Sequence, residues 1–413
     1  MTEETPRDPS TVRIRLRPGR EKAVLDHGHP WLFSGAVAAV EGSEDAPLAH
    51  VFAHDGRDLG LGLYSRRSQI RVRLLGRGVS AADRSFFAVR LEEAAALRET
   101  MLPPDTTGYR LLNAEGDGVP GWIVDRFGDT LVSQITSAGL EALRAEAYAA
   151  LTAAYPGYNV LQANQAPARR SEGLPPDDEP VVGEAPEEVS FQESGLTFVA
   201  EPAAGQKTGF YCDQRENRRL AERLAGGRSM LDLFAHTGAF GVYARRGGAR
   251  QVVHVESSAR LIDRGRRAYE ANGLAVDGGD QGWLPEWHEA NVFEWLRRPP
   301  GADEPREGFD LVVVDPPPLV ARRADLDRGA RAYKDVNRLA LRRTAPKGLY
   351  LTFSCSAAVD AKLFRQILFS ASREARVRLQ LLQPLAAAPD HPVAATHPEG
   401  EYLGGWLCRV LED

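Results

Sequence analysis

The sequence predicts an α/β protein in which a doubly wound, mostly parallel sheet follows two smaller domains. Strand and helix patterns alternate regularly after residue 189, and short strands broken by turns fill the first 80 residues. Between these regions, residues 169–188 are acidic and proline-rich and show no periodicity. Alternating strands and helices are typical of parallel sheets covered on both faces. We therefore expect a small β-barrel domain at 1–80, a small α+β domain at 81–188 and the doubly wound domain at 189–413. Two last strands, expected at 377–383 and 402–410, could close its sheet as an antiparallel hairpin.

The first domain is expected to carry a basic face. Its strands are predicted at residues 12–16, 31–34, 49–53, 60–64 and 69–74. Between Thr11 and Arg77, eleven Lys or Arg residues stand against seven Asp or Glu residues, which gives a local net charge of +4. Arginines that alternate with apolar residues along a strand share one face, where they suit phosphate contacts, although a solvated charged face is an open alternative. The candidate phosphate-binding residues are Arg13, Arg15, Arg66, Arg67, Arg71 and Arg73.

The composition of the whole chain excludes several classes of protein. The 413 residues carry a formal net charge of −6, which argues against nonspecific coating of nucleic acid. No apolar stretch reaches the length of a membrane span, and the first residues resemble neither a secretory signal nor a transit peptide. Three cysteines are too few and too scattered for a disulfide framework or a metal site. We expect a cytoplasmic protein that binds neither a membrane nor a metal.

The second domain is predicted to contain two strands, each with alternating apolar and polar residues, between two helices. The helices are expected at residues 83–101 and 140–154, and the strands lie within residues 113–136, joined at 127–129. The acidic, proline-rich residues 169–188 are expected to form a connection or exposed loop rather than a folded element.

The first two strand ends of the last domain carry residues suited to a nucleotide-like ligand. Doubly wound sheets bind ligands beyond the carboxyl ends of their strands. Asp232 ends the first strand, and Thr237 and Gly238 follow in a tight loop where a ligand could approach the backbone. Glu256 ends the second strand, eighteen residues past Gly238, a spacing typical of an acid that binds a ribose hydroxyl pair. A carboxylate that merely stabilises the next helix is the alternative.

The remaining strand ends add a purine contact, an acid and a thiol. Asn291 and Val292 follow the third strand and could face a purine. Asp315 follows a fully apolar strand and precedes three prolines, which indicates a rigid turn at the edge of the sheet. Cys355 follows the fifth strand and should point toward the same crevice as Asp315, although lone cysteines are usually buried structural thiols.

Several segments resemble one enzyme family. GQKTGFYCDQREN at 205–217, DLFAHTGAFG, FDLVVVDPPP, ARAYKDVNRLAL, LTFSCS and DHPVAATHPEGEYLGGWLCRV are similar to bacterial large-subunit ribosomal RNA cytosine-C5 methyltransferases of the RlmI type. The resemblance covers nearly the whole chain and implies an N-terminal PUA domain, a seven-stranded class I methyltransferase fold, and S-adenosylmethionine as cofactor. The predicted cofactor-binding residues are Phe210, Asp232, Phe234, His236, Thr237, Gly238, Glu256, Ser257, Asn291, Val292 and Asp315.

Two positions depart from the pattern of this family. Pro318 stands where relatives usually have lysine, so a basic contact to RNA is missing. Asn291 stands where relatives often have aspartate, and an amide can still bond an adenine amino group.

The resemblance implies covalent catalysis on cytosine. Cys355 is the expected nucleophile at carbon 6, and Asp315 is expected to stabilise the intermediate. Glu399 is the candidate base for the proton at carbon 5, with Asp390 and Glu401 as weaker candidates. Methylation at another RNA position, such as a guanine nitrogen, and a non-catalytic RNA-binding or assembly factor are the alternatives. The expected partner is large-subunit ribosomal RNA, and a homodimer is left open.

Overall fold

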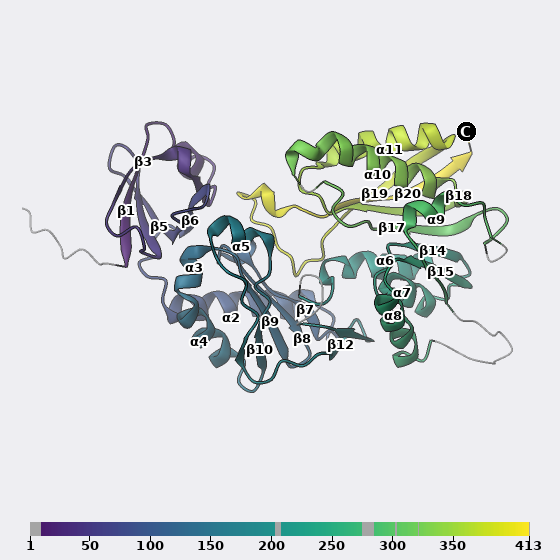
Figure 1. Ribbon diagram of the computed structural model, residues 1–413, viewed down its shortest axis with the longest axis horizontal. Coiled ribbons are helices and arrows are strands. Elements are labelled where there is room, and N and C mark those ends of the chain that lie inside the picture. Colours follow the sequence, from purple (N-terminus) through teal and green to yellow (C-terminus); the bar gives the residue numbers. More distant parts are fainter. Residues whose placement is uncertain (1–9, 203–207, 275–284, 302–303, 321, 413) are drawn as a thin grey trace, which may run out of the picture. The chain divides into compact units, whose positions relative to one another are not determined.

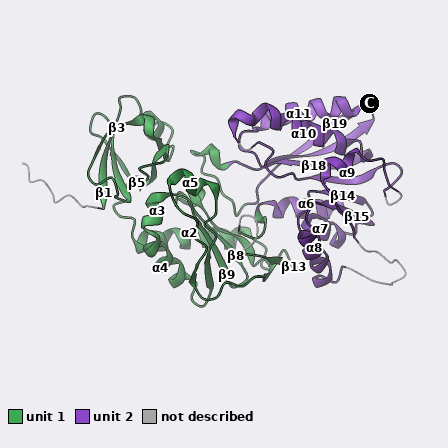
Figure 2. Ribbon diagram, in the orientation of Figure 1, with its two compact units in different colours: residues 1–195, 199–212, 389–400 green, residues 196–198, 213–388, 401–413 purple. Residues whose placement is uncertain are grey.

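The computed structural model describes residues 10–202, 208–274, 285–301, 304–320 and 322–412. The chain divides into two compact units (Figure 2). Unit 1 comprises residues 1–195, 199–212 and 389–400, and unit 2 comprises residues 196–198, 213–388 and 401–413. The three-domain division at residues 80 and 188 stays a prediction. Segment 389–400, which that division assigns to the last domain, packs within unit 1.

The first sheet of unit 1 encloses a small apolar core. Among the described residues its six strands run in the order β2-β6-β5-β4-β1-β3. Its elements are β1 (Thr11–Leu16), α1 (Lys22–Leu25), β2 (Trp31–Phe33), β3 (Val37–Glu41), β4 (Leu48–Phe52), β5 (Asp58–Tyr64) and β6 (Ile70–Gly76). Along β1, Val12, Ile14 and Leu16 are buried, whereas the arginines between them are exposed. The sequence did not predict β3, because this edge strand is mostly exposed and lacks an alternating pattern.

The second sheet of unit 1 is covered by helices. Its strand order in the described residues is β11-β10-β9-β8-β7. Its elements are α2 (Arg84–Met101), β7 (Gly108–Asn113), β8 (Trp122–Phe127), β9 (Thr130–Ile135), α3 (Ala138–Ala142), α4 (Arg144–Ala154), β10 (Asn159–Gln162), α5 (Pro167–Glu172) and β11 (Pro180–Val182). The Asp83 carboxylate begins α2 by accepting hydrogen bonds from Ser85 and Phe86 N–H groups. Phe87 of α2 packs edge-on against Trp122 at the centre of this core.

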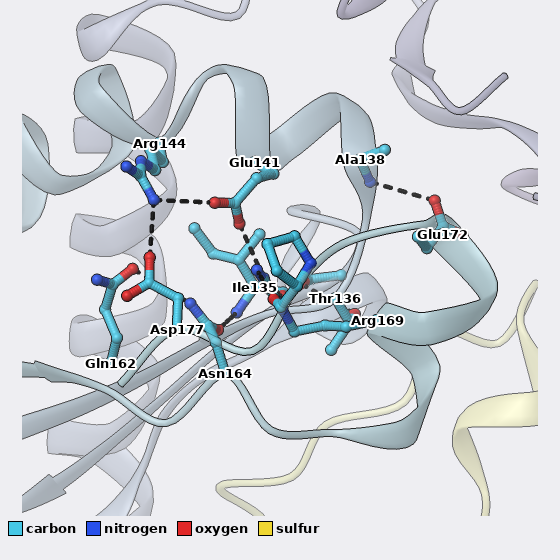
Figure 3. A network of polar contacts seen from close by, with 12 residues as sticks. Ile135, Thr136, Ala138, Glu141, Arg144, Gln162, Asn164, Arg169, Glu172 and Asp177 are labelled. Atoms are coloured by element: carbon cyan, nitrogen blue, oxygen red, sulfur yellow. Dashed lines mark hydrogen bonds and ion pairs between the residues drawn. The ribbon is translucent and has the colours of Figure 1, made fainter. Parts of the chain in front are cut away.

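The prediction of an unfolded connection at residues 169–188 is wrong for part of that segment. Its first residues end helix α5, and β11 pairs with β10. The Arg169 guanidinium is buried and donates to the Ile135 carbonyl at 2.6 Å and to Glu141 Oε2 at 2.8 Å (Figure 3). Glu172 accepts from the Ala138 N–H at 3.1 Å. Because polar groups satisfy one another here, the segment folds without the apolar periodicity that reveals most elements.

Unit 2 contains the predicted parallel sheet. In the described part of the chain, seven strands run in the order β16-β15-β14-β17-β18-β20-β19, and β20 runs antiparallel to the other six. This arrangement confirms the α/β prediction, including the closing antiparallel hairpin. Its strands are β14 (Ser229–Leu233), β15 (Gln251–Glu256), β16 (Glu286–Glu289), β17 (Phe309–Val314), β18 (Thr344–Ser354), β19 (Val377–Ala386) and β20 (Gly404–Glu412). Before them, β12 (Val189–Glu193) and β13 (Leu196–Ala200) form a two-stranded sheet.

Helices cover both faces of the seven-stranded sheet (Figure 1). One face carries α6 (Arg215–Leu224), α7 (Ala239–Arg246) and α8 (Ala259–Ala271), and the other carries α9 (Val292–Arg297), α10 (Leu326–Leu341) and α11 (Ala361–Ala375). The carboxyl ends of the parallel strands are thereby left to the connecting loops, where the predicted site residues lie. None of the helices that the structure describes has the length and apolarity needed to span a bilayer.

Candidate active site

The loop after β14 has an unusual backbone. Phe234, His236 and Gly238 all adopt positive φ angles, of 60°, 52° and 66°. Positive φ is costly for residues with a side chain and occurs most often where a site requires it. The Ala235 N–H donates to the Val255 carbonyl at 3.2 Å, so the loop is also fixed to the neighbouring strand β15.

Glycines at this loop and at the start of helix α7 lie close to buried rings. A Cβ added to Gly241 would lie 2.2 Å from Cε1 of His254, and one added to Gly238 would lie 2.7 Å from the Trp287 ring. Gly265 of α8 approaches the same ring, at 2.3 Å. The direction in which a side chain at Gly238 would project is therefore filled by the Trp287 ring, so a larger residue does not fit at this position.

Beneath the loop lies a buried polar chain that the sequence analysis did not assign. Nδ1 of His254 lies 3.0 Å from Oδ2 of Asp232, and Nε2 lies 2.9 Å from the Tyr269 hydroxyl. The imidazole also stacks on Trp287, with ring centroids 4.0 Å apart. Burial raises the pKa of the Asp232 carboxyl. Asp232 thus faces His254, and the sequence signal that was overlooked is the polar residue inside the apolar strand VVHVE.

Glu256 fixes the loop after β14 to the loop after β15. Its Oε2 accepts from the His236 N–H at 2.9 Å, and its Oε1 accepts from the N–H groups of Ser257 at 2.8 Å and Ser258 at 3.0 Å. Predicted cofactor-binding residues of two adjacent strand ends therefore come together here.

Asn291 and Val292 begin helix α9. The Asn291 Oδ1 accepts from the Phe293 N–H at 2.9 Å, so its carbonyl caps the helix while the residue as a whole remains exposed. Val292 is buried in the core, and Phe293 packs edge-on against Phe234. The third strand end is thus joined to the loop after β14 by an aromatic contact.

Cys355 contacts the residue that follows Asp315. Asp315 directly follows β17, and the Cys355 Sγ donates to the carbonyl oxygen of the next residue, Pro316, at 3.4 Å. Cys355 is half-buried, whereas Cys212 and Cys408 are buried. Burial raises the pKa of the Cys408 thiol well above its usual range. Of the three cysteines, Cys355 is the one placed at the edge of the sheet beside an acid.

Other predicted site residues lie in unit 1. Glu399 accepts from Nε2 of His29 at 3.1 Å, and this hydrogen bond helps to keep the pKa of the carboxyl below its usual range, although burial acts the other way. Asp390 is buried and accepts from the Arg110 N–H at 3.0 Å, so it anchors segment 389–400. Phe210 is buried against Phe191. Glu401, by contrast, is exposed and belongs to unit 2.

The arginines predicted to share one basic face differ in their exposure, and one of them is buried. Arg13 and Arg15 are exposed on β1, and Arg66, Arg67 and Arg71 are exposed or half-buried around β6. Arg66 pairs with Glu44 at 2.9 Å. Arg73 is not part of this face, because its guanidinium is buried against Glu172 at 2.9 Å.

Comparison with known proteins places this arrangement in a family. Residues 122–397 match the S-adenosylmethionine-dependent methyltransferase family, and residues 14–77 match a PUA-like domain. Over 404 residues the chain is 38% identical to the ribosomal RNA large subunit methyltransferase I of Shewanella denitrificans, covering 97% of this chain and 99% of the relative. The chain belongs to this methyltransferase family. The protein of the same name from Shewanella amazonensis is 39% identical, covering 97% of this chain and 100% of the relative.

Solved structures agree on the fold of the methyltransferase. A methyltransferase crystallised in complex with SAH matches with a TM-score of 0.80 and 21% identity, covering 97% of this chain and 100% of the other. An S-adenosylmethionine-dependent methyltransferase from Streptococcus mutans matches with a TM-score of 0.79 and 21% identity, covering 96% and 100%. The predictions of an α/β methyltransferase with a PUA-like β domain and of S-adenosylmethionine as cofactor are confirmed.

The residues of unit 2 fit this cofactor. Thr237 Oγ1 is buried in the loop after β14 and has no hydrogen-bond partner among the described residues. A buried hydroxyl without a partner is costly, and a polar ligand at this loop would satisfy it. The motif GQKTGFYCDQREN spans residues 205–217, and its first three residues, 205–207, lie outside the described residues. In the described ranges, no cluster of three or more His, Cys, Asp or Glu residues could hold a metal ion.

Proposed function

We propose that this methyltransferase forms 5-methylcytidine in large-subunit ribosomal RNA through a covalent bond to Cys355. The observation that carries the proposal is the 3.4 Å contact between Cys355 Sγ and the Pro316 carbonyl, which holds a half-buried thiol beside Asp315. The names of the relatives, which act on large-subunit ribosomal RNA, support the substrate class. A nucleophile and an acid at adjacent strand ends are what covalent activation of a pyrimidine needs.

The proposed chemistry begins with the thiolate of Cys355, which adds to carbon 6 of cytosine. The electron pair of the C5–C6 double bond then makes carbon 5 nucleophilic, and Asp315 stabilises the ring by bonding its N3 and amino edge. S-adenosylmethionine, when bound, would supply an electrophilic methyl group: carbon 5 would form a bond to this methyl as the sulfonium–methyl bond breaks, which leaves S-adenosylhomocysteine. A base removes the proton from carbon 5, the double bond forms again, and the thiolate leaves carbon 6. Glu399 is the proposed base, because an ionised carboxylate can accept this proton.

We propose that the cofactor is held by the loops after β14, β15 and β16. Thr237, Gly238, Glu256 and Ser257 would contact it from the first two loops, and Asn291 from the third. Glu256 would exchange its hydrogen bonds with loop N–H groups for ribose hydroxyls. The other proposed cofactor-binding residues are Phe210, Asp232, Phe234, His236, Val292 and Asp315. Within this set, Asp232 would act through His254 and the packed loop.

The proposed RNA-binding residues are the exposed arginines of the PUA-like domain. Arg13 and Arg15 share the outward face of β1, as phosphate contacts along a strand require. Arg66, Arg67 and Arg71 extend the set, whereas Arg73 is left out because it is buried. RNA must present the target base outside any stack before Cys355 can reach it. The cytoplasmic location and a homodimer stay predictions.

The test uses ribosomal RNA that carries 5-fluorocytosine in place of cytosine. Fluorine at carbon 5 cannot leave as a proton does, so the enzyme should be trapped as an adduct that resists denaturant. The Cys355→Ser variant should form no adduct. Mass spectrometry of nucleosides from unmodified RNA should show 5-methylcytidine. A methylguanosine in its place, or no product at all, would overturn the proposal in favour of a nitrogen methyltransferase or a non-catalytic factor.

A further inference from the structure

Two hydroxyl groups join the loop that follows β17 to the loop that follows β18. The Tyr333 hydroxyl of α10 lies 3.0 Å from the Ser356 Oγ. Ser356 Oγ accepts from the Val320 N–H at 3.2 Å, and the Tyr333 hydroxyl accepts from the Leu319 N–H at 3.5 Å. Tyr333 is fully buried and Ser356 nearly so. We call this pair the hydroxyl clamp.

The far end of the same loop is also fixed by packing. Val320 is buried in a cluster with Tyr333 and with Phe364 of α11. A Cβ added to Gly329 of α10 would lie 2.2 Å from Cγ2 of Val320 and 2.6 Å from the Leu319 carbonyl oxygen. The loop therefore packs directly against the backbone of α10, and this close packing restricts the positions that residues 319–320 can adopt.

The clamp acts on the residues that flank the proposed reaction centre. Ser356 directly follows Cys355, and Leu319 and Val320 end the segment that begins with Asp315. The 3.4 Å contact between Cys355 Sγ and the Pro316 carbonyl joins the same two loops at their other end. The two loops are thus connected twice, once through the nucleophile and once through the clamp.

We infer that Tyr333 and Ser356 are positioning residues, which hold the loop after β17 against the loop after β18 and so fix Cys355 relative to Asp315. The inference rests on the proposed role of Cys355 as nucleophile. Neither hydroxyl needs to touch RNA or cofactor, since each acts through the backbone N–H groups it accepts. A small displacement of a reacting group can lower a rate strongly, so the clamp determines kcat more than binding.

The experiment compares Tyr333→Phe and Ser356→Ala with Tyr350→Phe in the full-length enzyme. Tyr350 is a matched control, because its hydroxyl is also fully buried and donates at 2.8 Å to Asn337 of the same helix α10, but it lies within β18. For each variant, kcat, both KM values and the melting temperature are measured. Iodoacetamide alkylation of Cys355, followed by mass spectrometry in the absence of RNA, reports the placement of the thiol directly.

We expect Tyr333→Phe and Ser356→Ala to lower kcat by roughly tenfold to a hundredfold, with KM for S-adenosylmethionine nearly unchanged. Alkylation of Cys355 should become faster, because its thiol is no longer held at the Pro316 carbonyl. The double variant should be little worse than either single variant, since both remove the same connection. Tyr350→Phe should lower only the melting temperature.

Wild-type kcat and wild-type alkylation in Tyr333→Phe would overturn the inference. So would a loss of kcat in Tyr350→Phe equal to that in Tyr333→Phe, because a general loss of stability would then explain both. Failure of the proposed function has a different signature, namely full turnover by Cys355→Ser. The alkylation result does not depend on turnover, so the two failures can be told apart.

Discussion

The α+β region of unit 1 and the loops after β17 and β18 of unit 2 bury polar groups of different kinds. In unit 1 the Arg98 guanidinium is 1% exposed and makes two 2.7 Å hydrogen bonds with Asp117, and Arg110 pairs with Asp125 in the same way. In the loops after β17 and β18 the buried groups are neutral hydroxyls and backbone amides. Removing one member of a buried ion pair leaves a charge without its partner, whereas removing a hydroxyl leaves a smaller defect. Substitutions in unit 1 should therefore report folding, and those in the loops should report chemistry.

The sharpest test of this difference is Cys355→Ser. An alcohol has a far higher pKa than a thiol, so the variant should lose methyl transfer by several orders of magnitude while it keeps its fold and its cofactor affinity. Cys408→Ser is the control, because this cysteine is fully buried within β20. It should keep its activity and lose about 1–3 kcal/mol of unfolding free energy, the cost of burying a hydroxyl. Normal turnover by Cys355→Ser would mean that the loops after β17 and β18 have only a structural role, and the proposed difference from unit 1 would be wrong.

Unit 1 should show the opposite behaviour. Arg98→Met leaves Asp117 buried without its partner and should lower the free energy of unfolding by about 3–5 kcal/mol. Arg15→Met, on the exposed face of β1, should leave that free energy unchanged and weaken RNA binding and its dependence on salt. Urea unfolding and RNA affinity at several salt concentrations measure both. If Arg98→Met has the same free energy of unfolding as the wild type, then the buried ion pairs do not stabilise unit 1.

A comparison of Arg13 with Arg73 shows which features the sequence alone does not predict. The parallel strands, the closing hairpin and the residues at the strand ends follow from apolar runs and their spacing, so the sequence predicts where Cys355 and Asp315 meet. Arg73, in contrast, alternates with apolar residues just as Arg13 does, yet it is buried against Glu172, 99 residues away. A pairing between distant residues leaves no local pattern, and the same holds for α5 and for the placement of Glu399 beside His29.

A change in glycine packing beside the loop after β14 should give a smaller effect than the loss of a buried ion pair. Gly241→Ala places a methyl group 2.2 Å from Cε1 of His254, and overpacking of this kind costs about 1–3 kcal/mol. Gly404→Ala is the control, since its Cβ would meet nothing within 4 Å. Thermal unfolding and calorimetry of S-adenosylmethionine binding should show a less stable protein with weaker binding for Gly241→Ala alone. Stability like that of Gly404→Ala would show that His254 can move to accommodate the added methyl group.

The smallest effect on stability is expected at the contact between Trp31 and His397 of segment 389–400. Here a histidine ring that is neutral at about pH 8 lies in the unit that also contains the buried ion pairs. The two ring centroids lie 4.5 Å apart, and the Trp31 Nε1–H donates to Glu115 Oε1 at 2.8 Å. Burial lowers the pKa of His397 below its usual value, although Glu115 and Glu399 act in the opposite direction. Because the folded-state pKa is the lower one, the unfolded chain takes up the proton first as the pH falls. The stabilisation is therefore complete above about pH 6.5 and is lost below it.

His397→Phe keeps an aromatic ring on Trp31 but cannot titrate, so its urea midpoint should fall less steeply than that of the wild type between about pH 7 and pH 5.5. The lowered pKa of Glu399 acts in a separate range, because that carboxylate loses its contribution only as the pH falls below about 4.3. At about pH 8 the His397 ring is neutral in the wild type, so the difference between the two midpoints there measures packing alone and serves as the reference. Equal slopes for both proteins would show that His397 is not the titrating group. A steeper slope for the variant would show that protonated His397 stabilises unit 1 by pairing with Glu115 and Glu399, as the arginines elsewhere in this unit do with their acids.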